Sequence, residues 1–306
     1  MTTKNRPDDS IDTLVILGHT GFVGSRLTAH FQEKHPRLKI IPVSSRDIDL
    51  SKAEQCERLK DHLTMRTMVI MTAGIKSNYG NDVNLYLNNV SMAANICRII
   101  SDHPVRKFVF FSSIAVYGVD VSNRRLTEQT APDPDTYYGL SKFDSERLLS
   151  LAFSKLTDSS LVLLRVSSIY GPGEKIIAPT PSGFLITYLE GGEVTLWGDG
   201  SEYREFLFID DIVRIVEGLY LGDYEGVLNV GGHQPHTYRG ALKCISQLLG
   251  KKIRVRHKPR SKKKVDKVYD RKNSLVRKLF PRLEFTPLET GLEIIRRQHA
   301  SRNPTP

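Results

Sequence analysis

The chain has 306 residues, of which 40% are hydrophobic and 25% are charged, with a formal net charge of +10. This is enough apolar content for one large domain with a smaller one attached. The apolar runs have the length of strands and the polar N-terminus lacks the layout of a signal peptide, so we expect a cytoplasmic protein without a membrane partner. Its three cysteines, at unrelated spacings, predict neither a disulfide framework nor a zinc cluster, and no metal is expected.

The first predicted strand, Leu14–Leu17, runs into a glycine-rich turn and then into a segment of helical composition. Such a turn lets the backbone approach a pyrophosphate, whose charge is met by free N–H groups and by the positive end of the helix dipole. A tight turn that binds no ligand would show the same GxxGxxG spacing. Our preferred interpretation is a dinucleotide site formed by Gly18, Thr20, Gly21, Phe22, Val23 and Gly24.

The next predicted strand, Leu38–Val43, is followed by a short polar sequence where dinucleotide folds bind the cofactor ribose. An acidic residue about 20 positions after the glycines favours NAD, whereas a nearby arginine accommodates the 2′-phosphate of NADP. The residue about 20 positions after Gly24 is a serine. We therefore predict NADP(H), with the 2′-phosphate bound by Ser44, Ser45 and Arg46; Asp47 is an alternative ribose ligand that would favour NAD(H).

A further apolar strand, Met68–Ala73, is followed by a polar loop that contains Lys76. The ammonium of Lys76 either faces the substrate or is solvated, and the sequence leaves both interpretations open.

The central prediction concerns the segment from Lys107 to Lys142. Its buried strand, Phe108–Phe111, ends at Ser112 and Ser113, and a later helix carries Tyr138 and Lys142 four residues apart, on one face. A nearby ammonium lowers the pKa of a phenol, which can then exchange a proton with a substrate oxygen as a hydride is transferred. A serine hydroxyl at the strand end would hold that oxygen. Without a hydride carrier nearby, an amphipathic surface helix accounts for Tyr138 and Lys142 equally well.

Another buried strand, Leu161–Ser168, is broken by the sequence from Tyr170 to Gly173. The chain is expected to return to the first domain with the strand Phe206–Ile209 and the helix that starts at Asp210. The predicted fold class is α/β, a Rossmann-type doubly wound parallel sheet with a smaller C-terminal substrate-binding domain. The nucleotide-binding domain would comprise residues 1–170 and about 206–232, and the substrate-binding domain residues 171–205 and 233–306.

Taken in order, the segments GHTGFVG, SSIAVYG, YGLSK, RVSSIYGPG and WGDGSEYREFLFIDDIV resemble the extended short-chain dehydrogenases/reductases. This is the NAD(P)-dependent epimerase/dehydratase family that acts on nucleotide sugars, and the resemblance extends from about Leu14 to Leu292. It implies a catalytic serine at Ser113 with Ser112 beside it in the substrate site, a catalytic base at Tyr138, and a supporting Lys142. Tyr138 and Lys142 would also contact the cofactor.

The resemblance further implies cofactor contacts for five residues: Asp49, Leu50, Ala73, Gly74 and Asn89. For Asn88 and Asn89, capping of a helix that runs to Ile99 is an equally good explanation. Arg204 would contact the nucleotide diphosphate, and a homodimer would form through this helix and the one that carries Tyr138.

Departures from the family pattern reduce the number of reactions that the chain could catalyse. Dehydratases of the family place an Asp-Glu pair directly after the catalytic residue, where this chain has Ile114-Ala115. The GDP-fucose synthases carry a cysteine at the position of Ala115 and a histidine at that of Gly173, and both are missing here. The reactions that remain are those that need only a hydride transfer and one proton, namely reduction of a 4-keto sugar and 4-epimerisation.

Because net reductases of the family use NADPH and epimerases generally retain NAD, the predicted NADP site favours an NADPH-dependent reductase of a nucleotide-linked 4-keto deoxysugar. A 4-epimerase with tightly bound NAD(P) is the alternative. A non-catalytic NADP-binding sensor or scaffold is a third hypothesis, which the retained serine, tyrosine and lysine disfavour.

The positive charge is concentrated in residues 251–278, which hold fourteen Lys or Arg and two Asp. A basic arm for nucleic acid or an anionic membrane surface would have this composition. The segment lacks the interleaved aromatic residues that stack on bases, so we expect no nucleic-acid partner. The family resemblance implies instead, and we prefer, that this part of the chain closes over the nucleotide diphosphate, with Arg260 or Arg271 as the phosphate ligand.

Overall fold

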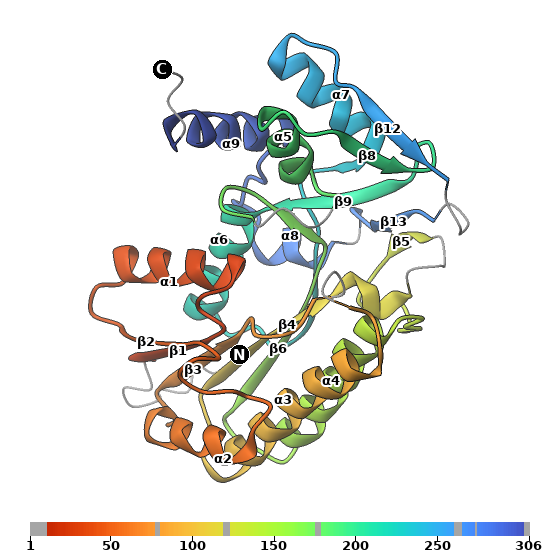
Figure 1. The fold of residues 1–306 in the computed structure, drawn as a ribbon. Helices are drawn as coiled ribbons and strands as arrows, with labels where there is room; N and C mark the ends of the chain where they lie inside the picture. Colours follow the sequence, from red (N-terminus) through yellow and green to blue (C-terminus); the bar gives the residue numbers. More distant parts are fainter. Residues whose placement is uncertain are drawn as a thin grey trace.

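The structure, a computed structural model, describes residues 11–76, 80–118, 123–174, 179–259, 265–272 and 274–302. A six-stranded parallel sheet with the order β10–β6–β4–β3–β1–β2 forms the lower lobe in Figure 1. Its strands are β1 (Thr13–Leu17), β2 (Lys39–Val43), β3 (Thr67–Met71), β4 (Lys107–Ser113), β6 (Ser160–Val166) and β10 (Gly226–Val230). The predicted fold class, a Rossmann-type parallel sheet with a C-terminal domain, is confirmed.

Helices cover both faces of this sheet, because successive apolar side chains of each strand point to opposite faces. Leu14 and Ile16 belong to the apolar core shared with α1 (Phe22–Lys34) and α6 (Ile209–Leu221). Val15 and Leu17 belong to the core shared with α2 (Ala53–Cys56), α3 (Val83–Asp102) and α4 (Tyr137–Phe153). The short 3₁₀ helices η1 (Glu57–His62) and η3 (Ile114–Tyr117) complete this lobe.

A second lobe lies above the first in Figure 1 and contains three smaller sheets. These sheets pair β7 (Ser168–Tyr170), β9 (Tyr203–Phe208) and β11 (Pro235–Thr237); β8 (Val194–Trp197) with β12 (Val255–Lys258); and β5 (Asn123–Leu126) with β13 (Lys267–Tyr269). Four of their strands, β5, β7, β8 and β9, lie in the sequence before β10, the last strand of the large sheet. The helices are α5 (Pro181–Leu189), α7 (Tyr238–Leu249), α8 (Leu275–Leu279) and α9 (Leu288–Arg302).

Three local predictions were wrong. Ser112 and Ser113 belong to β4, and the strand predicted at Leu161–Ser168 divides at Ser167 into β6 and β7, which lie in different sheets. Of the predicted strand Phe206–Ile209, the first three residues end β9, which pairs with β7 and β11 instead of entering the large sheet, and Ile209 begins α6. The chain returns to the first lobe through α6 and β10. On this basis we propose that residues 1–170 and about 206–232 form the nucleotide-binding domain, and that residues 171–205 and 233–306 form the substrate-binding domain.

Within the described residues, no helix is long and apolar enough to cross a membrane. The same part of the chain contains no group of three or more His, Cys, Asp or Glu side chains arranged to hold a metal ion.

Candidate active site

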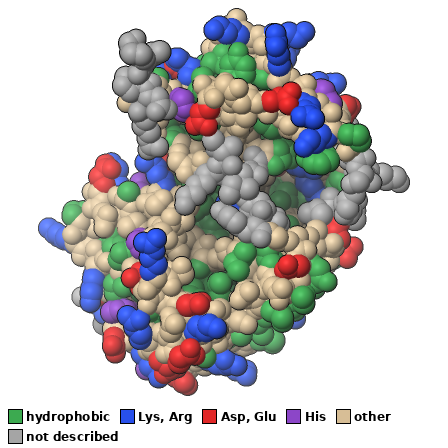
Figure 2. All heavy atoms as spheres, viewed as in Figure 1, with side chains coloured by type: hydrophobic (Ala, Val, Ile, Leu, Met, Phe, Trp, Pro, Cys, Tyr) green, Lys and Arg blue, Asp and Glu red, His purple; other side chains and the backbone are tan. Residues whose placement is uncertain are grey.

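A cavity of about 340 Å³ lies at the carboxyl ends of β1, β3, β4 and β6. In open α/β sheets this edge is where ligands bind, close to the point where the strand order reverses. On the face drawn in Figure 2, the surface is hollowed between the two lobes. The cavity is lined by Gly21, Phe22, Val23, Gly24, Thr72, Gly74, Lys76, Phe111–Ile114, Tyr138, Lys142, Val166–Ile169, Glu174 and Thr180.

The glycine-rich turn forms one wall of this cavity. Gly18 has a φ of +93°, and a Cβ there would lie 2.8 Å from the backbone nitrogen of Ala73. A Cβ on Gly24 would collide with the carbonyl oxygen of Gly18. Helix α1 begins directly after Gly21, without a side-chain cap and without an acidic residue in its first turn. Its first N–H groups therefore have no helical partner, and the turn fits a pyrophosphate.

The predicted ribose end of the groove carries a carboxylate beside the serines that were predicted to bind the 2′-phosphate. Ser44 is buried, and its hydroxyl and backbone N–H both donate to the carboxylate of Asp47, at 2.6 and 2.9 Å. These bonds lower the pKa of Asp47, which stays ionised at neutral pH. Ser45, Arg46 and Asp47 are exposed, so a guanidinium and a carboxylate both stand at this end of the cofactor groove.

The structure brings Tyr138 and Ser113 together in the cavity. Thr136 caps α4 by accepting a hydrogen bond from Gly139, which sets Tyr138 in the first turn of the helix. Tyr138 and Ser113 both line the cavity, close enough for Ser113 to act on the pKa of Tyr138. Burial raises the pKa of Tyr138 and the Ser113 hydroxyl lowers it, with a net increase. The predicted lowering of this pKa by Lys142 is therefore wrong, and burial keeps the phenol protonated.

Lys142 lies deeper than Tyr138. Its ammonium donates to the carbonyl oxygen of Phe111 at 2.8 Å and stands 4.8 Å from the centre of the Phe110 ring. Burial lowers the pKa of Lys142 to about 8, while the charge of Glu146 raises it and that of Lys76 lowers it.

Ser112 and Ser113 have different partners, because neighbouring residues of a strand point to opposite sides. The Ser112 hydroxyl donates to the buried carboxylate of Glu146, which also pairs with Arg165 at 2.6 Å. Ser112 contributes to the cavity wall, but its hydroxyl is committed to this pair. Its predicted contact with substrate therefore lacks a free hydroxyl, and Ser113 is the better candidate.

The side chain of Asn89, which was predicted to contact the cofactor, is buried and bonded to the protein backbone. The side-chain amide accepts from the N–H of Ile75 at 2.8 Å and donates to the carbonyl of Ile75 at 3.0 Å and to Ser141 at 3.2 Å. It lies in the middle of α3, whose cap is Asp82, so the capping interpretation of Asn88 and Asn89 was wrong. Asn89 positions the loop that carries Gly74 and Lys76.

Lys76 is an exposed cavity residue, with its ammonium 6.0 Å from the centre of the Phe22 ring. The other predicted cofactor residues around this edge are Asp49, Leu50, Ala73 and Thr20. The Asp49 carboxylate accepts two bonds from Ser51, and the Leu50 side chain is buried in the core. Ala73 lies against Gly18, and Thr20 is exposed in the turn.

The predicted phosphate ligands of the second lobe do not line this cavity. The Arg204 guanidinium donates to the carbonyls of Tyr203 and Val265 and lies 5.6 Å from the centre of the Tyr238 ring. Arg271 lines a separate small cavity together with Glu205. The Arg204 side chain is thus bound to backbone carbonyls, whereas Arg271 Nη1 is buried without a hydrogen-bond partner among the described residues. Arg260 lies outside the described residues.

Glu174 is a cavity residue that was not predicted from the sequence. It follows the turn after β7, lines the cavity, and accepts hydrogen bonds from Thr180, at 2.9 Å, and Ser182. A glutamate in a segment rich in Gly, Pro and Thr gives no periodic signal, so only the position of the loop reveals it.

The geometry fits a nicotinamide dinucleotide, with the pyrophosphate at Gly18–Gly24 and the nicotinamide end beside Tyr138 and Ser113. A model of the NAD dependent epimerase/dehydratase family matches residues 14–231. The chain belongs to this family. The expected class of enzyme, one that acts on nucleotide sugars by oxidoreduction or epimerisation, is confirmed at this level.

Individual relatives are distant. The GDP-L-colitose synthase of Yersinia pseudotuberculosis is 24% identical over 259 residues, which cover 78% of this chain and 82% of that protein. The N-acetyl-alpha-D-glucosaminyl-diphospho-ditrans,octacis-undecaprenol 4-epimerase of Escherichia coli O157:H7 is 24% identical over 263 residues, 81% of this chain and 76% of that protein.

Among solved structures, the UDP-glucose 4-epimerase of Thermus thermophilus in complex with NAD superposes with a TM-score of 0.79 at 22% identity, over 93% of this chain and 99% of that chain. The NDP-hexosamine 5,6-dehydratase TunA gives 0.82 at 18% identity, over 95% and 99%. These likenesses show the fold.

Proposed function

We propose that the protein reduces the 4-keto group of a nucleotide-linked deoxysugar with NADPH. The observation that carries this proposal is the Tyr138–Ser113 pair at the cavity wall, with the pKa of the phenol raised by burial. A protonated phenol is the form that a general acid needs. The residues that directly follow Ser113, Ile114 and Ala115, cannot exchange protons.

In this mechanism the dinucleotide supplies the hydride when bound. Ser113 holds the substrate carbonyl oxygen, and Tyr138 donates its proton to that oxygen as negative charge develops there. General acid catalysis of this kind contributes about 10²–10⁴-fold. Lys142, anchored on the Phe111 carbonyl, lines the same cavity and would hold the cofactor there.

A 4-epimerase is the second candidate, and the ionised Asp47 favours it. A carboxylate at the ribose end accepts the 2′-hydroxyl of NAD and repels the 2′-phosphate of NADP. The related structure from T. thermophilus, a UDP-glucose 4-epimerase, was solved with NAD. NADP preference therefore depends on Arg46, which remains part of our proposal.

The test is to mix the protein with NADPH and a panel of 4-keto-6-deoxy nucleotide sugars and to follow NADPH fluorescence. A reductase consumes NADPH, and Tyr138→Phe should slow consumption about 10²–10⁴-fold with unchanged NADPH binding. Interconversion of plain UDP-sugars without net consumption would identify the epimerase instead. Binding of NADPH with neither reaction would favour the sensor.

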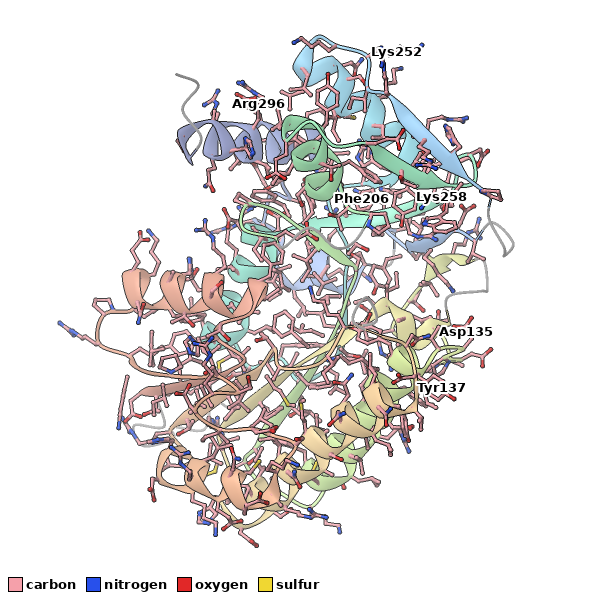
Figure 3. The ribbon with its side chains drawn as sticks, viewed as in Figure 1. Asp135, Tyr137, Phe206, Lys252, Lys258 and Arg296 are labelled. Carbon is pink, nitrogen blue, oxygen red and sulfur yellow. The ribbon has the colours of Figure 1, made fainter. Side chains whose placement is uncertain are left out.

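We also propose that the enzyme is a cytoplasmic homodimer formed through α3 and α4. These two helices pack side by side, and Figure 2 shows hydrophobic side chains over them on the lower right. The exposed apolar residues are Val83, Leu87, Tyr137, Leu140 and Leu151, and Figure 3 shows Tyr137 on the outer side of α4. Exposed apolar groups of this kind mark interaction sites. A monomeric mass in solution at micromolar concentration would contradict this.

A further inference from the structure

The loop after β7 places a carboxylate in the cavity, opposite the first lobe. Glu174 stands behind two glycines with φ of +154° (Gly171) and +84° (Gly173), which direct the chain into the cavity wall. Most of the other polar groups that line the cavity are hydroxyls, backbone groups and the two ammonium groups of Lys76 and Lys142. A carboxylate there would meet the sugar end of a substrate, because the glycine turn is taken by the cofactor.

The orientation of this carboxylate is fixed by two hydroxyls. Thr180 accepts from the N–H of Gly183 at 3.1 Å, and Ser182 accepts from the N–H of Gly171 at 3.2 Å. Each hydroxyl therefore directs its single proton to Glu174, and both bind the same oxygen, Oε2. The second oxygen, Oε1, accepts no hydrogen bond from the described residues.

A second polar group of the same cavity also lacks a partner. The hydroxyl of Ser167 is buried, with 7% of the residue exposed, and makes no hydrogen bond within the described parts of the chain. Buried polar groups are normally satisfied. An acceptor at Glu174 and a hydroxyl at Ser167 suit a ligand that carries hydroxyl or amino groups.

We infer that Glu174 is a substrate-binding residue whose free oxygen accepts a hydrogen bond from a hydroxyl or amino group of the sugar, which selects neutral and amino sugars against uronic acids. This inference rests on the proposed function, because it requires that a nucleotide sugar enters the cavity. A uronic acid would bring a second carboxylate towards Glu174, and such like-charge contacts are how sites reject a competing ligand. Burial raises the pKa of Glu174, while its bonds from Ser182 and Thr180 and the charge of Lys76 oppose this rise.

The experiment uses calorimetry, in the presence of NADPH, to measure the binding of nucleotide sugars. The ligands are the glucose and the glucuronic acid esters of UDP, GDP, CDP and dTDP, that is, UDP-glucose, UDP-glucuronic acid and their counterparts. The wild type should prefer the glucose ester of its nucleotide by at least about tenfold. Glu174→Gln keeps the acceptor for Thr180 and Ser182, so the fold is retained; the preference should fall by about tenfold. Glu174→Asp keeps the charge and should keep the discrimination while it weakens binding of the glucose ester. Glu190→Gln, the same change at the exposed end of α5, is the control and should behave as wild type.

An unchanged preference in Glu174→Gln, or a wild type that prefers the glucuronic acid ester, would overturn the inference and leave the proposed reductase standing. A wild type that binds NADPH but none of the esters would also overturn the inference, and the NADPH-consumption assay with 4-keto-6-deoxy sugars tests the proposed reductase separately. Failure of the reductase assay alone does not affect this experiment, which does not depend on turnover.

Discussion

Removal of one charge from the buried pair beneath the catalytic strand should destabilise the protein strongly. In this pair, Arg165 Nη2 lies 2.6 Å and Arg165 Nε 3.0 Å from the carboxylate oxygens of Glu146. The two side chains are only 6% and 2% exposed. Burial alone would lower the pKa of Arg165, but its bonds to Glu146 outweigh this effect and raise it. The substitution Glu146→Gln leaves the guanidinium buried without its counter-charge.

The expected cost follows from what remains around Arg165. Its Nη1 still donates to the Tyr117 hydroxyl at 2.9 Å, but a neutral partner does not offset a desolvated cation. Breaking a buried pair in this way costs about 3–5 kcal/mol. Replacing both residues, as Glu146→Leu with Arg165→Met, removes both charges and should restore most of the loss, since apolar replacements of buried pairs are often neutral.

Urea unfolding of the cofactor-free protein at pH 7 measures these differences. The matched control is Glu193→Gln, which breaks a pair with Arg256 at 3.4 Å whose side chains are 58% and 63% exposed. An exposed pair contributes at most about 1 kcal/mol. If Glu146→Gln costs no more than Glu193→Gln, water reaches Arg165 and the reasoning from burial is refuted.

Three further results are expected. Gly24→Ala should weaken NADPH binding at least tenfold in a fluorescence titration (an estimate of ~1.4 kcal/mol), because its Cβ collides with Gly18; wild-type affinity would contradict the tight turn. Arg46→Ala should reduce the preference for NADPH over NADH about 10-fold or more, the value of one charge-assisted bond, and an unchanged ratio would refute NADP selection by Arg46. Burial raises the pKa of Glu205 from 4.5 to about 7, with Arg271 opposing. The folded state therefore binds the Glu205 proton more tightly than the unfolded state does. The contribution of this proton to the free energy of unfolding is complete below pH 4.5 and is lost as the pH rises through about 7. Glu205→Gln should flatten the urea midpoint over this pH range; an unchanged slope would show that Glu205 does not titrate there.

The parts of the site that were predictable from sequence depend on local geometry. The glycine turn needs only a strand, a tight bend and a helix start, and Tyr138 and Lys142 need only the period of one helix. Strand alternation decides that Ser113 and not Ser112 meets the phenol, but it requires the end of β4 to be known to one residue.

The remainder depends on how distant segments pack. An apolar run such as Phe206–Phe208 shows that a strand is buried, but not which sheet it joins. Arg204 and Arg271 have the side chains of phosphate ligands, yet backbone carbonyls and Glu205 compete for them. Asn89 was assigned to the cofactor although its amide is satisfied by Ile75, and no pattern announces a bond to backbone 14 residues away. Figure 3 likewise places Lys252 and Lys258 at the outer edge of the second lobe, a position that charge counting could not supply.

The position of β10 has a consequence for biosynthesis. This strand is the outer neighbour of β6, but the ribosome makes it only after β7, β8 and β9 have been translated. Until then the nascent chain exposes the unpaired edge of β6, which is a template for wrong pairing. A truncated product that stops after Val166 would keep that edge permanently, so a shortened gene for the nucleotide-binding half should include β10.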